Sequence, residues 1–183
     1  MLSGQSGGIS KNDGIGVGKM KNNNDNAVAY DSRHDTFQHI NNVEKKIRVV
    51  MVDLWERAQN HDQSKFESPE KEIFDKFVPL LEEVKFGTPE YSEITAQMKV
   101  ATNNHNTVNR HHPEHFVDGI KGMNLIDLIE MLCDWKAAGE RRSDGDILES
   151  IAFCQKRFGY SDELKEILEN TANYLWIERK EEE

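Results

Sequence analysis

The sequence has few cysteines and no long apolar segment. Its two cysteines, Cys133 and Cys154, stand alone within apolar helical patterns, which argues against a zinc ribbon or a paired redox motif and predicts reduced core thiols. No apolar run reaches the roughly eighteen residues of a membrane span. The first five residues also lack the basic and apolar regions of a secretory signal. We therefore expect a cytoplasmic protein that does not interact with membranes.

Basic charge is also scarce. The chain has 23 Lys and Arg against 33 Asp and Glu, a formal net charge of -10 and an isoelectric point near 5.2. Because proteins that bind nucleic acids usually present a strongly basic face, this balance argues against a nucleic acid duplex as partner and favours small substrates or protein partners. At 183 residues and 37% hydrophobic content, the chain is sufficient for one sizeable core.

The first 30 residues differ in composition from the rest. They are dominated by Gly, Asn, Ser and Asp and contain almost no bulky apolar side chains, which predicts a flexible tail over residues 1–30. Met20 offers a second start position and leaves open whether residues 1–19 are native. A single domain is expected over residues 31–178, and residues 179–183 form a charged, solvated end.

From Ser32 onward the apolar residues recur at helical spacing. The first helix should extend to Asn60 with Asp35 as its cap, and its apolar positions are Phe37, Ile40, Val43, Ile47, Val50, Leu54 and Ala58. Further helices are predicted over 69–77, where Pro79 interrupts the pattern, and over 89–104, 124–138, 144–158 and 161–178, with an irregular loop from 105 to 122. No strand pattern is present, so we expect an all-α, compact domain of about six helices.

The histidines are concentrated in one part of the chain. All seven lie between His34 and His115, and two groups stand out, the His61-Asp62 doublet and the stretch from His111 to His115, which reads HHPEH. Imidazole and carboxylate groups together suit divalent Mn, Fe, Zn, Co or Mg, and such an ion can generate a nucleophilic water near neutral pH. The sequence therefore predicts a metal-dependent hydrolase with one or two ions.

The motif His61-Asp62-Gln63-Ser64-Lys65 resembles that of the HD-domain metal phosphohydrolases over residues 33–136. That resemblance implies His61 and Asp62 as the metal-binding doublet, Asp134 as the closing aspartate and His39 as the upstream histidine. It also implies that Asp62 takes part in catalysis and that Lys65 neutralises the phosphate of a small phosphorylated substrate, in the first place a nucleotide. In the branch with a second metal, the additional ligands correspond to His105, His111 and His112.

A second resemblance covers Tyr30 to Tyr160. The motifs Ser68-Pro69-Glu70-Lys71 and the segment 109–115, which reads NRHHPEH, are similar to those of uncharacterised proteins of phages and bacteria, a family without an assigned activity. Arg110 lies inside the motif 109–115, and Lys65 lies inside the motif 61–65. We therefore expect both side chains to bind substrate phosphate.

The place of His39 depends on the first helix. A straight helix would separate His39 from His61 by ~33 Å, so His39 can share an ion with His61 only if the helix breaks between them. Without His39, the site would consist of His61, Asp62, His105, His111 or His112, and Asp134. Asp127, Glu130 and Asp134 share one helical face, and any of the three could approach the ion; the resemblance favours Asp134.

Two other functions remain open at this stage. The acidic surface suits a non-catalytic interaction protein in which a metal, if bound, is a structural clamp. A minority of HD-type relatives carry out oxygen-dependent chemistry at paired irons, which makes a di-iron oxygenase the second alternative. The His61-Asp62 doublet can also be read as a polar helix end, and the charged face of the 124–138 helix as solvated surface. The sequence does not determine which metal is bound, which substrate is used or whether the chain forms a homo-oligomer.

Overall fold

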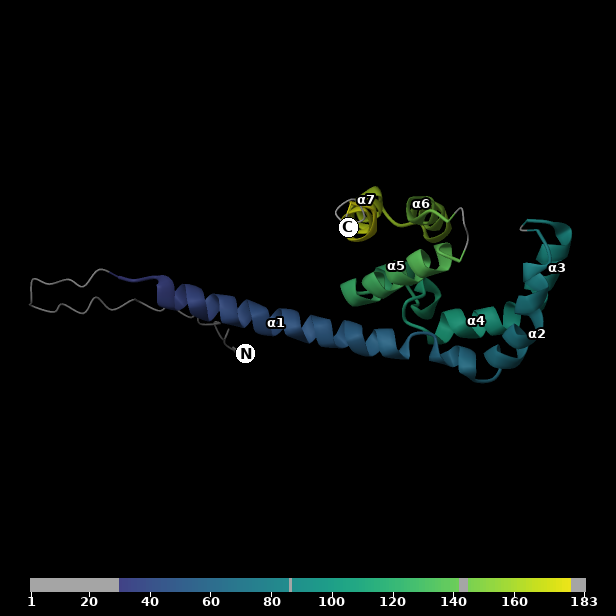
Figure 1. Cartoon of the computed structure of the whole chain (residues 1–183), viewed down its shortest axis with the longest axis horizontal. Coiled ribbons are helices and arrows are strands. Elements are labelled where there is room, and N and C mark those ends of the chain that lie inside the picture. The colour runs from purple at the N-terminus through teal and green to yellow at the C-terminus, as the bar shows by residue number, and fades with distance from the viewer. Residues whose placement is uncertain (1–29, 86, 142–144, 179–183) are drawn as a thin grey trace, which may run out of the picture. The chain divides into compact units, whose positions relative to one another are not determined.

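The computed structural model describes residues 30–85, 87–141 and 145–178. This part of the chain contains no strand, so the all-α prediction is confirmed. None of its helices combines the length and apolar character needed to cross a bilayer. The predicted tail, apart from Tyr30, and the charged end lie outside the described residues. The α-helices in this part are α1 (Arg33–Asn60), α2 (Glu70–Glu82), α3 (Pro89–Gln97), α4 (Lys99–Val108), α5 (Leu125–Gly139), α6 (Ile147–Phe158) and α7 (Asp162–Ala172) (Figure 1).

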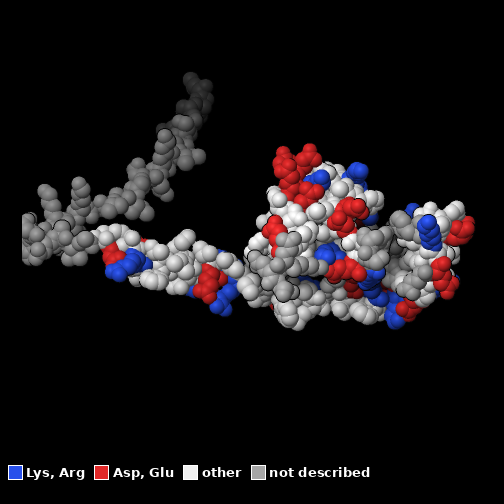
Figure 2. Space-filling view, turned by 45° about the horizontal axis from the view of Figure 1, so that its top comes forward, with Lys and Arg blue, Asp and Glu red and all other residues white. Residues whose placement is uncertain are grey.

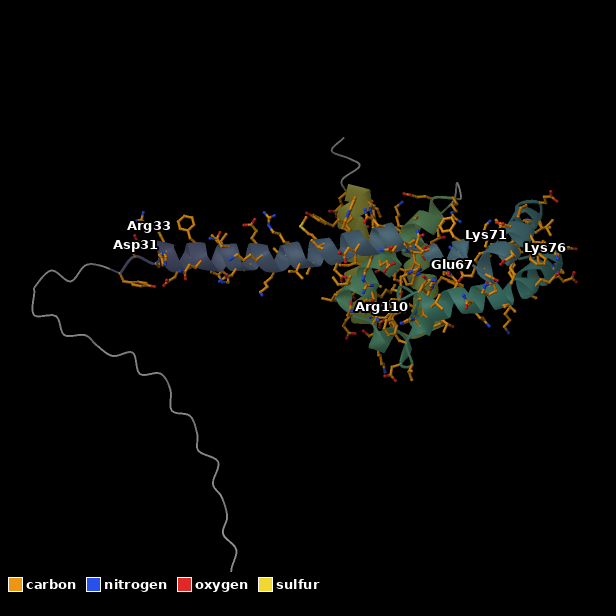
Figure 3. The ribbon with its side chains drawn as sticks, turned by 90° about the horizontal axis from the view of Figure 1, so that it is seen from below. Asp31, Arg33, Glu67, Lys71, Lys76 and Arg110 are labelled. Carbon is orange, nitrogen blue, oxygen red and sulfur yellow. The ribbon has the colours of Figure 1, made fainter. Side chains whose placement is uncertain are left out.

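The chain divides into two compact units within α1, Met1–Ile40 and Asn41–Glu183. In the first unit, the backbone N–H of Arg33 donates to Asp31 over 3.0 Å, and the guanidinium of Arg33 pairs with the same carboxylate (Figure 3 labels both). Asp35, predicted as the cap, instead lies in the first turn of α1. The helix therefore begins earlier than the apolar pattern indicated, because Asp31 supplies the side-chain acceptor for its first turn.

In the second unit, α5, α6 and α7 enclose an apolar core. Met131 and Leu132 of α5 pack with Ile151 of α6, and α6 pairs with α7 (Figure 1). Cys154 is buried in this core, and burial raises the pKa of its thiol to about 11. The prediction of a core thiol is thus confirmed for Cys154. It is wrong for Cys133, which is exposed on α5 because that position faces away from the core.

The helices α2, α3 and α4 pack together through Phe77, Met98 and Ala101, which are buried. α2 continues through Pro79, contrary to the predicted interruption. Because proline has no N–H, the carbonyl of Asp75 has no helical hydrogen-bond partner, and both residues are exposed to water. The predicted helix over 89–104 is two helices, since α3 ends before Met98 and α4 begins after it.

α4 extends to Val108, so His105 lies on a helix and not in the predicted loop. Weak helix formers such as Asn and Thr dominate its sequence, which is why composition indicated a loop. The loop after α4 contains the short 3₁₀ segments η2 (Pro113–His115) and η3 (Gly119–Gly122). The last predicted helix, 161–178, ends its α-helical part at Ala172 and continues as a π-helical turn, η4 (Asn173–Ile177).

Candidate metal centre

The site begins at the turn that ends α1. Asp62 adopts a left-handed backbone conformation, with φ 58° and ψ 18°, immediately before the 3₁₀ segment η1 (Gln63–Phe66). Asp and Asn tolerate this conformation better than most residues because their short polar side chains can bond locally. The turn brings the ammonium of Lys65 back onto the Oδ2 of Asp62. One oxygen of Asp62 is thus paired with Lys65, and the other, Oδ1, is turned inward.

Three imidazoles converge on Asp62 Oδ1. The Nε2 atoms of His61, His105 and His111 lie 3.5, 3.2 and 3.3 Å from it. None of these contacts has hydrogen-bond geometry, and Asp62 Oδ1 and His111 Nε2 are buried without a hydrogen-bond partner among the described residues. Buried polar atoms nearly always have a hydrogen-bond partner. These unpaired atoms, a carboxylate oxygen and an imidazole nitrogen, therefore point to a further ligand at this place.

The other ring nitrogens of these histidines are held by carboxylates. Glu70, fully buried at the start of α2, accepts from His105 Nδ1 at 2.9 Å. Glu130 Oε1 lies 3.0 Å from His61 Nδ1 and 3.2 Å from His111 Nδ1. A carboxylate on one nitrogen leaves the opposite nitrogen as an electron-pair donor, which is the usual second-shell arrangement around metal-binding histidines. Glu70 and Glu130 therefore set the tautomer that directs all three Nε2 atoms inward.

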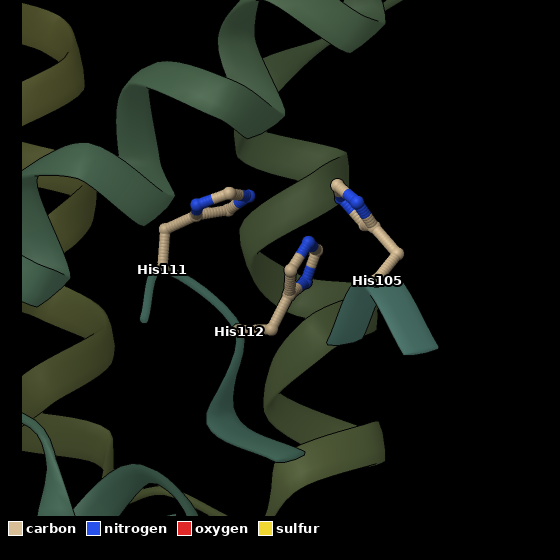
Figure 4. A group of neighbouring side chains, drawn as sticks. All are labelled: His105, His111 and His112. Atoms are coloured by element: carbon tan, nitrogen blue, oxygen red, sulfur yellow. The ribbon is translucent and has the colours of Figure 1, made fainter. Parts of the chain in front are cut away.

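Among residues 30–85, 87–141 and 145–178, two sets of side chains have ligand atoms close enough to hold an ion. His105, His111 and His112 form one set (Figure 4), and His61, His111 and Asp134 form the other; within each, the ligand atoms lie within 4.8 Å of one another. His112 Nε2 is also buried without a hydrogen-bond partner among the described residues. His111 belongs to both sets, and since each of its ring nitrogens would bind one ion only, its Nε2 could serve one set at a time.

The charges of the cluster favour a cation. Hydrogen bonding to Asp134 and to Glu130 raises the pKa of His61 to about 10. Burial alone would raise the pKa of Asp62, but His105, His111 and Lys65 together lower it. Burial, together with the neighbouring His111, lowers the pKa of His112 to about 3. At neutral pH Asp62, Glu130 and Asp134 are therefore ionised and His112 is a neutral imidazole, the form that binds metals, whereas His61 holds a proton that a bound ion would displace.

Behind the cluster lies a pair of arginines on one buried carboxylate. Asp127 is fully buried in the capping box of α5. It accepts from Arg57 at 2.7 Å and from Arg110 at 3.1 and 3.0 Å. Arg57 also donates to Glu130 at 3.1 Å. The end of α1, the loop after α4 and the first turns of α5 are thus joined by charged hydrogen bonds that hold Glu130 beside the histidines.

A pocket of about 410 Å³ lies between α1 and α5 and reaches the cluster. Its walls include Leu54 and Ala58 of α1 and Ile129 of α5, while His61 and Asp134 line it on the side of the cluster. This volume is within the range of small-molecule sites. The candidate ligand atoms are therefore accessible from a mostly apolar pocket.

The structure brings together most of the residues that the sequence suggested. His61, Asp62, Lys65, His105, His111, His112 and Asp134 meet in one cluster. Arg110, marked in Figure 3, bonds to Asp127 and lies over the ring of Phe116, and its role in binding substrate stays a prediction. α1 is unbroken from Arg33 to Asn60, so the break that His39 needed does not exist, and neither of the two ligand sets among the described residues includes it.

Sequence reasoning missed the outer carboxylates. Glu70 was part of a recognised motif, but no role was assigned to it, and its distance along the chain from His105 gave no sign of contact. Glu130 was considered only as an alternative ligand to Asp134. The helical spacing of Asp127, Glu130 and Asp134 was nevertheless informative, because all three contribute to the site. Asp127 bonds to the arginines, Glu130 lies beside the Nδ1 atoms of the histidines, and Asp134 lies beside Nε2 of His61.

Fold and site together define a class: an all-α protein with a half-buried cluster of histidines and carboxylates at the junction of α1, α4 and α5. No curated protein and no solved structure matches the chain. Residues 28–174 match the family of unknown function DUF5662, and the chain belongs to that family. The match contains every residue of the cluster. The resemblance to HD-domain phosphohydrolases is not tested by these comparisons and stays a prediction.

Proposed function

We propose that the protein is a metal-dependent phosphohydrolase that acts on a small phosphorylated substrate. The observation that carries this proposal is the convergence of three Nε2 atoms on the buried Oδ1 of Asp62, with the opposite nitrogens held by Glu70 and Glu130. Nitrogen and carboxylate donors of this kind suit Mn, Fe, Zn or Co. The ligands would be Asp62 with His61, His105, His111, His112 and Asp134.

A bound divalent ion at this site would supply a water of lowered pKa and polarise a phosphoryl oxygen. Hydrolysis replaces the bond between phosphorus and the leaving oxygen with a bond to the water oxygen, and the leaving oxygen takes up a proton. Lys65, whose side chain is 38% exposed, is close enough to Asp62 to balance the charge of the phosphoryl oxygens. Asp134, at the edge of the pocket, is placed to orient the attacking water.

The pocket supports a catalytic site over a structural clamp. A structural metal site is closed, whereas a catalytic site keeps an open position for substrate. Here the pocket beside His61 and Asp134 gives access to the cluster. Its apolar walls, Leu54, Ala58 and Ile129, suit the organic part of a phosphate ester. A nucleotide is the first substrate class to test, and the pocket volume leaves room for a small ester of another kind.

The proposal is tested with the full chain loaded with Mn²⁺ and a panel of nucleoside mono-, di- and triphosphates and p-nitrophenyl phosphate. We expect metal-dependent release of phosphate or, from a nucleoside triphosphate, of the nucleoside monophosphate and pyrophosphate. Replacing Lys65 with methionine should lower kcat by ~100-fold even when the metal site is saturated, because the charge that balances the phosphoryl oxygens is lost and no ligand is removed. The matched control is Lys71→Met. Lys71, labelled in Figure 3, is an exposed lysine of α2 that pairs with Asp75.

Other outcomes of the same experiment separate the alternatives. A metal-loaded protein that releases no phosphate, but unfolds when the metal is chelated, would support a structural clamp and contradict the hydrolase. Oxygen uptake by the iron-loaded protein without phosphate release would support the oxygenase. Equal activity of Lys65→Met and the unsubstituted protein would remove Lys65 from the mechanism.

Arg57 should control metal affinity through Glu130. Replacing it with glutamine removes the charged donor from Glu130, so the carboxylate loses its fixed position beside His61 and His111. We expect the dissociation constant for Mn²⁺ to rise by ~10–100-fold, the usual cost of losing an outer-shell partner. Arg110→Gln is the matched control, since Arg110 bonds the same Asp127 but has no hydrogen bond to Glu130. Equal loss of affinity in both variants, by competition with a chelator, would contradict this role.

A further inference from the structure

One face of α1 is apolar along most of its length. Within the second unit, Val43, Ile47, Val50 and Leu54 follow each other at spacings of four, three and four residues, which places them in one stripe. The stripe continues into Ala58 and His61, which line the pocket beside α5. The end of α1 near the site therefore lines this pocket, and the same face runs on beyond it.

This stripe is exposed in the described structure. Val43, Ile47 and Val50 retain 42%, 53% and 43% of their accessible surface, and α1 contains no buried residue over its 28 residues. Figure 2 shows the charged residues of α1 in separate groups with uncharged surface between them. Isolated helices are only marginally stable in water, and helices in proteins depend on packing of an apolar face. The α1 face therefore requires a partner.

The charge and composition of the chain point to a second copy as that partner. Residues 41–60 contain four basic and three acidic side chains in a chain of net charge -10, so this face avoids the repulsion that two copies would experience elsewhere. Residues 1–29 have no comparable apolar stripe, and the family match leaves out nearly all of them but covers α1 entirely. A two-fold dimer pairs a patch with itself, and a face that is apolar and nearly neutral satisfies that requirement.

We propose that α1 packs antiparallel against α1 of a second copy, with the two-fold axis between Ile47 and Val50. In this register Ile47 of one copy lies opposite Val50 of the other, and Val43 lies opposite Leu54, at the edge of the pocket. About 30 Å of helix takes part. The exposed α5 residues Leu125 and Ile129, 74% and 37% accessible, extend the apolar surface.

Sedimentation equilibrium of the full chain tests the proposal. The unsubstituted protein should be a dimer at micromolar concentration, and Val50→Glu should raise the dimer dissociation constant by at least ~100-fold. Val52→Glu is the matched control, because Val52 is 56% exposed on the opposite side of the same helix and carries the same substitution. Circular dichroism verifies that both variants remain helical. A monomeric unsubstituted protein, or equal effects of the two variants, would overturn the proposal.

The orientation has a test of its own. In a Cys133→Ser background, chains with Val43→Cys should form disulfides with chains carrying Leu54→Cys when the two are mixed. Neither chain should cross-link efficiently with itself, since in the antiparallel register each position meets the other one. Self-pairing of Val43→Cys in preference to the mixed pair would indicate a parallel helix pair and overturn the antiparallel arrangement.

Discussion

Replacing Asp62 with asparagine is expected to abolish stoichiometric metal binding and, with it, phosphate release. Asp62 is the residue on which the Nε2 atoms of His61, His105 and His111 converge. The substitution keeps the size and shape of the side chain but removes its negative charge. Loss of that charge leaves several imidazoles without a central anionic ligand, so the affinity for a dication should fall by at least ~100-fold.

The backbone makes this variant interpretable. Asp62 has φ 58°, and asparagine adopts the left-handed conformation at least as readily as aspartate. The fold around the turn should therefore be retained, which circular dichroism and thermal unfolding can verify. Asp75→Asn is the matched control, since Asp75 is an exposed carboxylate of α2 that pairs with Lys71 and lies outside the cluster. Full metal content in Asp62→Asn would remove Asp62 from the ligand set and contradict the proposed centre.

Replacing Asp127 with alanine should have the largest effect on stability. Asp127 is fully buried, accepts from Arg57 and Arg110, and completes the capping box of α5 with Asn124. Its removal leaves two guanidinium groups without their shared acceptor and opens the first turn of α5. Breaking a buried ion pair from one side costs about 3–5 kcal/mol of unfolding free energy, and loss of a cap contributes to that loss.

Urea denaturation of the Asp127→Ala variant measures this effect. The midpoint should fall with little change in the slope, because the loss acts on the folded state. Asp75→Ala is the matched control: Asp75 pairs with Lys71 on the surface of α2, and exposed pairs of this kind contribute little. Nearly equal midpoints for the two variants would mean that the arginines find other partners and that the network does not hold α1 to α5.

Much of the fold follows from local patterns. The spacing of Phe37 to Ala58 predicted α1, and the helix predicted over 124–138 is α5, which Asn124 caps. Errors arose where a local signal was overruled by its surroundings. Pro79 is tolerated inside α2 because the freed carbonyl faces water, and the Asn-rich segment before Asn109 is helical because Ala101 and His105 face α2.

The inner residues of the candidate site carry a sequence signature, and the outer ones do not. The His61-Asp62 doublet and the His111-His112 pair are recognisable in the sequence because ligand-type residues adjoin each other. Glu70 and Arg57 are single charged residues in helices rich in charge, and nothing local distinguishes them from solvated ones. Glu70 meets its partner only because α2 packs against α4, and Arg57 only because the end of α1 lies within hydrogen-bond distance of Asp127 and Glu130 of α5; both depend on tertiary structure.

The long α1 shows the same limit in another way. Its apolar stripe predicted a helix that packs on a core, yet the described part of the chain offers little cover for it. Periodicity indicates that a face will be buried but does not say by what. A partner outside the chain satisfies the pattern as well as an internal core does.

The most direct test of the central claim is elemental analysis of the purified full chain after reconstitution in turn with Mn²⁺, Fe²⁺ and Zn²⁺ and removal of excess ion. We predict at least one tightly held ion per chain, and two if both sets of candidate ligands are occupied. A chain that retains none of these metals would contradict the metal centre, and with it the hydrolase.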